Sequence, residues 1–75
     1  MRIDRDSDGN PSISMYATDA QTRAFVQAVT DTELAWWARQ QELGSVHANL
    51  AEDRSSHDHS AAIAHDEIRR RTRHA

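Results

Sequence analysis

The chain has 75 residues, a formal net charge of −3 and no cysteine. A chain this short forms at most one domain, and without cysteine it lacks the disulfides and the thiolate zinc frameworks that usually stabilise small cores. The acidic charge also disfavours non-specific binding to nucleic acid, which depends on neutralising phosphates. Association with another chain is the remaining way to stabilise so small a core, and we therefore expect a homo-oligomer, with a dimer favoured.

The sequence shows neither a membrane span nor a secretion signal. No run approaches the roughly 18 apolar residues that a spanning helix needs, and the polar segment 1–6 lacks the apolar centre of a signal peptide. All nine basic residues are arginine, and alanine and aspartate are abundant, as GC-rich codons produce. We therefore expect a small cytoplasmic protein of a bacterium or phage, with no membrane partner.

Residues 1–17 differ in pattern from the rest of the chain. Turn-forming residues fill the stretch between Asp4 and Pro11, and the apolar residues that follow alternate with serine at the period of a short strand. A small hairpin between 2–5 and 12–16 is one alternative. A flexible arm is the other, because an isolated two-stranded hairpin is marginally stable in water.

Helical signals begin at Thr18. The pairs Thr18 with Gln21 and Thr30 with Glu33 have the spacing of a capping box, in which each side chain accepts a hydrogen bond from a free backbone N–H at the helix start. An aspartate follows each threonine and places negative charge in the first turn. The pattern predicts two helices, over 19–29 and 31–53.

Gly44 is the residue that could interrupt the second of these helices. It costs a helix interior about 1 kcal/mol relative to alanine. The large apolar residues on either side of it nevertheless keep one helical phase: Trp36, Leu43, Val46 and Leu50. We therefore expect the helix to continue through Gly44.

The polar stretch that follows leaves two arrangements open. In the favoured one the chain bends at Ser55 and Ser56, Ser56 caps a third helix over 57–72, and the last two helices form a hairpin. In the other, 31–72 is one long helix, because positions 50 and 61 are eleven residues apart and stay almost in register. In both, the fold is all-α, with a helical domain over 18–75 preceded by the arm.

Trp36 and Trp37 carry the main functional hypothesis. Neighbouring residues of a helix point about 100° apart, so both rings cannot enter one narrow core. Either one ring packs beneath the arm or Phe25, or it lies at an interface, where tryptophan is a frequent anchor. We interpret the chain as a non-catalytic regulatory or interaction module that self-associates and binds a partner protein through the surface between Phe25 and Leu50. The predicted partner-binding residues are Trp36, Trp37, Leu43, Val46 and Leu50.

The alternative function is that of a small DNA-binding regulator. It rests on the one basic cluster of the sequence, formed by Arg69, Arg70, Arg71 and Arg73. Asp66 and Glu67 precede two of these arginines by four residues, a spacing that favours ion pairs along a solvated helix end. Nucleic acid is therefore a disfavoured partner.

Asp4, Asp6, Asp8 and Gly9 reproduce the first half of an EF-hand calcium loop. The second half is missing, because Met15 stands where the loop needs a bidentate acid. A solvated turn is favoured, and calcium binding by the three aspartates stays open.

The histidines and the remaining polar residues show no arrangement typical of a metal site or an active site. His57 and His59 do not have the i, i+4 spacing of helical metal ligands; they are expected in a polar hinge, as pH-sensitive groups or as solvated spacers. The chain has no cysteine, no lysine and no glycine-rich phosphate loop. We therefore expect no metal, no cofactor and no enzymatic activity.

Overall fold

The computed structural model describes residues 3–73 and contains three helices preceded by a β-hairpin. The strands pair antiparallel, with Asp4 opposite Ser12 and Arg5 opposite Pro11. The elements are β1 (Asp4–Arg5), β2 (Pro11–Ser12), α1 (Asp19–Ala28), α2 (Asp31–His47) and α3 (Ala51–Arg73). The all-α prediction is confirmed. The arm takes its hairpin form, with strands shorter than the predicted 2–5 and 12–16, of which residue 2 lies outside the described residues.

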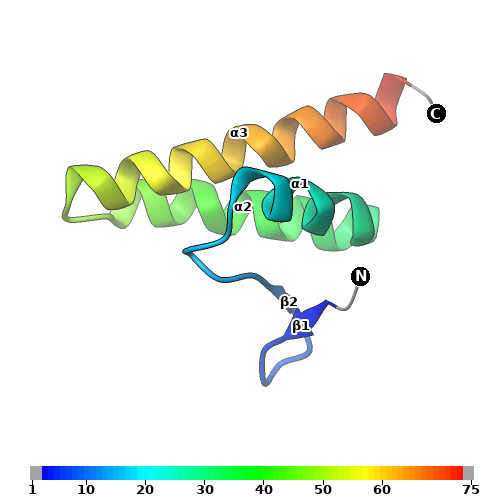
Figure 1. The fold of residues 1–75 in the computed structure, drawn as a ribbon, viewed down its shortest axis with the longest axis horizontal. Coiled ribbons are helices and arrows are strands. Elements are labelled where there is room, and N and C mark those ends of the chain that lie inside the picture. Colours follow the sequence, from blue (N-terminus) through cyan, green and yellow to red (C-terminus); the bar gives the residue numbers. More distant parts are fainter. Residues whose placement is uncertain (1–2, 74–75) are drawn as a thin grey trace.

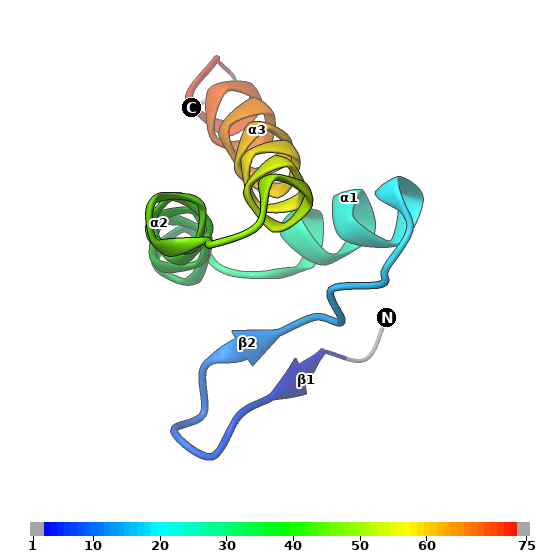
Figure 2. The same cartoon turned by 90° about the vertical axis from the view of Figure 1, so that its left-hand side faces the viewer.

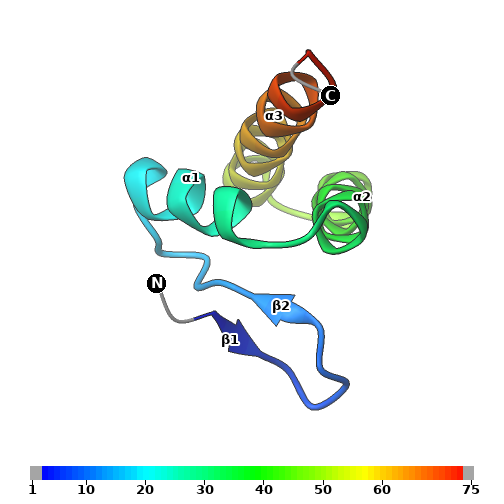
Figure 3. The ribbon, with the colours of Figure 1, turned by 90° about the vertical axis from the view of Figure 1, so that its right-hand side faces the viewer.

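The three helices form a triangle when the molecule is seen along the hairpin of α2 and α3. α1 packs beside this pair, and the β-hairpin lies beneath α1 and α2 (Figure 1, Figure 2 and Figure 3). None of the helices within the described residues is long and apolar enough to cross a membrane.

Both predicted capping boxes are present. Thr18 Oγ1 accepts from the Gln21 N–H at 3.1 Å, and Gln21 Oε1 accepts from the Thr18 N–H at 2.8 Å. Thr30 and Glu33 make the same two bonds at 3.1 and 3.0 Å. Each box satisfies two backbone N–H groups that have no partner within the helix. α1 and α2 therefore begin where the sequence predicts.

The boundary between the second and third helices differs from the prediction. α2 does continue through Gly44, but it ends at His47 instead of residue 53, and the chain turns over 48–50. α3 then runs unbroken from Ala51 to Arg73. The predicted bend at Ser55 and Ser56, the cap at Ser56 and the single helix over 31–72 are therefore wrong.

The earlier turn has a physical reason in the contacts that it creates between α2 and α3. It lets the first turns of α3 face the last turns of α2, so that Asp58 accepts a hydrogen bond from Ser45 Oγ. A bend at 55–56 would not bring Ser45 and Asp58 into hydrogen-bonding distance. Ser55 and Ser56 instead lie exposed on the surface of α3, where serine is tolerated.

The core is formed where the three helices meet. Phe25 of α1 and Trp37 of α2 are at its centre, with ring centroids 5.2 Å apart and ring planes at 62° in an edge-to-face arrangement. Ile3 and Ile13 of the arm pack against it and are partly buried. The buried residues of this cluster are Phe25, Val26, Val29, Leu34, Trp37, Ala38, Ile63 and Ala64.

Arg71, near the end of α3, joins all three helices. Its Nη2 donates to the carbonyl oxygens of Val26 and Val29, each at 2.8 Å, and its Nη1 donates to Asp31 Oδ1 at 2.7 Å. The last carbonyls of a helix have no partner within it. Arg71 therefore supplies hydrogen bonds to carbonyl groups at the end of α1. Asp31, in the first turn of α2, binds the same guanidinium group.

Candidate functional site

Large apolar side chains are exposed at the end of the helical hairpin, around the turn between α2 and α3. Leu43 is 38% exposed, Val46 74% and Leu50 55%. Leu43 and Val46 lie in the last turns of α2, and Leu50 lies in the turn itself. These three residues are the tip patch. All three were predicted as partner-binding residues, and the structure leaves them exposed at the same end of the α2–α3 hairpin.

The tip patch is turned outward because small and polar residues occupy the inner face of α2 at this level. A Cβ on Gly44 would lie 2.8 Å from Cε1 of the His57 ring, so a larger residue here would require that ring to move. Ser45 is buried beside it and bonds to Asp58. An amphipathic helix normally turns its apolar face inward, and here that order is reversed.

The two tryptophans have different environments, as their 100° separation implies. Trp37 is 5% exposed and packs against Phe25. Trp36 is half-buried at the edge of the core. Trp37 is therefore closed to a protein partner, and the little of it that is exposed lines a cavity; of the two predicted anchors only Trp36 reaches the outer surface.

Three of the four C-terminal arginines are engaged by acidic residues of α3. Arg69 pairs with Asp66, while Arg70 and Arg71 both bind Glu67, and Arg73 is exposed at the end of α3. The spacing of these pairs only partly follows the prediction. Glu67 does pair with Arg71 four residues on, but Asp66 pairs with Arg69 rather than Arg70.

Glu67 is the best-defined charged site of the structure. It is 5% exposed and accepts bonds from Arg70 Nε at 2.9 Å, Arg70 Nη2 at 2.6 Å and Arg71 Nε at 2.8 Å. The bonds from Arg70 lower the pKa of Glu67 from its usual 4.5 to about 2, and those from Arg71 act in the same direction, against the effect of burial. The same contact raises the pKa of Arg70.

The acidic loop of the arm bonds to its own backbone. Asp6 Oδ1 accepts from the N–H groups of Asp8 and Asn10, each at 2.9 Å. Gly9 has a φ of +83°, the left-handed conformation that a tight turn of this kind requires. Within residues 3–73 no group of three or more histidine, aspartate or glutamate side chains is placed to hold a metal ion.

The sequence predicted that His57 and His59 lie in a hinge. In the structure both lie within α3. His57 Nδ1 donates to Gln41 Oε1 of α2 at 3.0 Å. His59 Nε2 donates to Asp19 Oδ1 of α1 at 2.8 Å. Both rings therefore connect α3 to a neighbouring helix.

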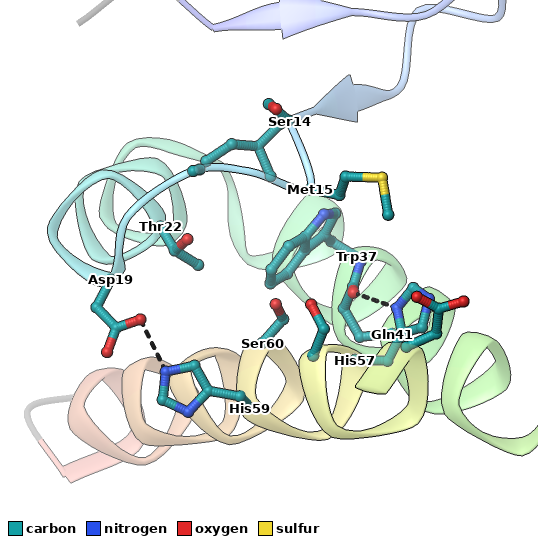
Figure 4. A pocket seen from close by; sticks show the side chains of 13 residues that line it. Ser14, Met15, Asp19, Thr22, Trp37, Gln41, His57, His59 and Ser60 are labelled. Carbon is teal, nitrogen blue, oxygen red and sulfur yellow. Dashed lines mark hydrogen bonds and ion pairs between the residues drawn. The ribbon is translucent and has the colours of Figure 1, made fainter. Parts of the chain in front are cut away.

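Sequence reasoning missed a cavity between the arm and the helices. Its volume is about 180 Å³, and side chains from four segments of the chain line it. Figure 4 shows the Trp37 indole on one wall, with Met15 and Ser60 beside it and the Asp19–His59 pair at one end. No local pattern in the sequence marks such a site, because residues as far apart as 13 and 60 have to come together to form it.

Comparison with known proteins does not add to these observations: no protein-family model, no curated protein and no solved structure matches the chain.

Proposed function

We propose that the chain is a non-catalytic interaction module that self-associates through the tip patch and presents the same end of the hairpin to a partner protein. The observation that carries the proposal is the outward placement of Leu43, Val46 and Leu50 within eight residues of sequence. Clustered apolar side chains on the surface of a small protein mark interaction sites, whereas isolated ones need no explanation.

The exposed area sets the strength of the association. Burying an aliphatic side chain completely contributes about 1.5–3 kcal/mol, so the partly exposed tip patch supplies roughly 4 kcal/mol per copy. Association costs about 4 kcal/mol or more in lost freedom of movement. Two copies that meet tip to tip about a twofold axis therefore form a weak dimer, with a net binding free energy of about 4 kcal/mol and a dissociation constant on the order of a millimolar.

The arginine cluster does not carry a second proposal. DNA binding needs arginines that are free to contact phosphates, and the guanidinium groups of Arg70 and Arg71 are held by Glu67. Arg71 is further committed to α1 and α2 through Val26, Val29 and Asp31.

Sedimentation equilibrium from about 10 µM to about 1 mM tests the proposal across the expected range. The average mass of the wild type should rise toward that of a dimer, and that of the double variant Val46→Glu, Leu50→Glu should stay monomeric. The matched control is Met15→Glu, Tyr16→Glu, because these arm residues are 68% and 88% exposed but lie outside the tip patch. It should associate like the wild type.

A constant wild-type mass up to the highest concentration would contradict self-association. Equal loss of association in both double variants would contradict the assignment to the tip patch. Far-ultraviolet circular dichroism of each variant establishes that the helices are retained, so that a monomeric mass reports on the interface.

A further inference from the structure

The cavity between the arm and the helices is lined by both charged and apolar side chains, and none of them belongs to the tip patch. Its negative groups come from the first turns of two helices, Asp19 in α1 and Asp53 in α3. Its apolar wall comes from Trp37, with Ile13 and Met15 of the arm. Among residues 3–73 no arginine lines it, and the chain contains no lysine.

The charges at the cavity favour a cation even though two helices begin there. A helix N-terminus acts as about half a positive charge, so the two termini offset only about half of the charge of the two carboxylates. From the carboxylates and the helix termini together, about one negative charge remains at the site. An anion would meet this charge with no arginine among residues 3–73 at the cavity to hold it.

Asp53 is the carboxylate that is available to a ligand. Asp19 already accepts the bond from His59. Asp53 is half-buried, and among residues 3–73 none of the ion pairs includes it. A half-buried carboxylate at the edge of a cavity is stabilised by an opposite charge brought to it.

Size and wall chemistry define the rest of the ligand. A water molecule occupies about 30 Å³ in the liquid, so 180 Å³ holds about six such groups. The indole of Trp37 can pack against a short hydrocarbon chain or bind a cation at its ring face. The hydroxyls of Ser56 and Ser60 can accept hydrogen bonds from a donor.

We propose that this cavity binds a small organic cation, a primary ammonium group on a chain of about four carbons, with the ammonium at Asp53 and the carbon chain against Trp37. The site is independent of the tip patch, and one can fail without the other. A ligand of so few atoms binds weakly, with a dissociation constant on the order of a millimolar.

The test is a titration of the ¹⁵N-labelled full chain with butylammonium chloride, followed by amide and indole N–H shifts at constant ionic strength. It is run at about pH 8, above the range in which histidine ordinarily takes up a proton. We expect saturable shifts at the Trp37 indole and at Ser56 and Ser60. Butanol, which has the same carbon chain without the charge, and butyrate, which has the opposite charge, should bind at least about fivefold more weakly.

The residue-level test is Asp53→Asn, with Glu52→Gln as its matched control. Both changes remove one negative charge from the first turn of α3, but Glu52 is exposed and does not line the cavity. Asp53→Asn should weaken butylammonium binding at least about fivefold, and Glu52→Gln should leave it within about twofold. Thermal unfolding of both variants establishes that the fold is intact.

Three results would overturn the proposal. One is the absence of saturable shifts with butylammonium at the cavity residues. Another is equal or tighter binding of butanol or butyrate, which would show that the site does not select a cation. The third is an equal effect of the two variants, which would mean that the overall charge of α3 attracts butylammonium without a site at Asp53.

Discussion

Glu67 is a buried carboxylate in α3 whose partners, Arg70 and Arg71, both come from the following turn. Removing its charge leaves the Arg71 guanidinium, which is only 21% exposed, with Asp31 as its one acidic partner. Breaking a buried pair costs more than the pair contributes as a whole, because the remaining charge is left uncompensated. Glu67→Gln should therefore lower the free energy of unfolding by about 2 kcal/mol, measured by urea denaturation followed by tryptophan fluorescence.

The neighbouring residue provides the control. Asp66 also pairs with an arginine, Arg69, but both side chains of that pair are more than half exposed. Exposed ion pairs contribute little, so Asp66→Asn should change the free energy of unfolding by less than about 0.5 kcal/mol. Equal effects of the two substitutions would show that burial does not distinguish the two pairs.

At the scale of elements, the close approach of α2 and α3 depends on Gly44. Alanine is the better helix former by about 1 kcal/mol, but its Cβ would lie 2.8–2.9 Å from three atoms of the His57 ring. That ring is half-buried and bonded to Gln41, so displacing it costs more than the helix gains. Gly44→Ala should destabilise the wild type by about 1 kcal/mol.

The same substitution in a chain carrying His57→Ala should have the opposite sign. With the ring removed, the helix propensity of alanine is no longer opposed, and Gly44→Ala should stabilise that variant by up to about 1 kcal/mol. Urea denaturation of the four proteins of this double-mutant cycle gives the coupling. If Gly44→Ala is stabilising in both backgrounds, the His57 ring does not oppose a Cβ at position 44.

The two ends of α2 show what sequence reasoning could and could not predict. Its start is fixed by Thr30 and Glu33, which are three residues apart. The sequence predicts a helix start from such a local pair. Its end depends on pairs such as Ser45 with Asp58 and Gln41 with His57, separated by 13 and 16 residues. No local pattern specifies which of these partners meet, and the continued apolar phase through residue 50 favoured the wrong boundary.

Some features of the candidate sites follow from local sequence, and others depend on residues far apart in the chain. The different environments of Trp36 and Trp37 follow from the helical repeat alone. The structural role of Arg71 does not, because its partners Val26 and Val29 are 45 and 42 residues away. The cavity at Asp53 is equally inaccessible to sequence reasoning, since each of its walls comes from a different element.

At the scale of the whole molecule, Glu67 makes stability depend on pH in the acid range. Its pKa is about 2 in the folded chain, against the usual 4.5, so the unfolded chain takes up a proton first as the pH falls. The stabilisation is therefore complete above pH 4.5 and is lost progressively between pH 4.5 and 2. Glu33 is a second carboxylate whose pKa is lowered. Its partner is Arg5 of the arm, at 2.5 Å, and this ion pair links the arm to α2.

Urea denaturation at a series of pH values between these limits separates the contribution of Glu67 from that of the other acids. The free energy of unfolding of the wild type should fall more steeply with acid than that of Glu67→Gln, by up to about 1.4 kcal/mol per pH unit, the limit for one proton. The variant Glu33→Gln, which removes the ion pair between the arm and α2 and leaves Glu67 in place, should retain the dependence that Glu67 causes. Parallel curves for the wild type and Glu67→Gln would mean that the carboxylate titrates alike in the folded and unfolded chains. In that case the bonds from Arg70 and Arg71 do not stabilise its charge.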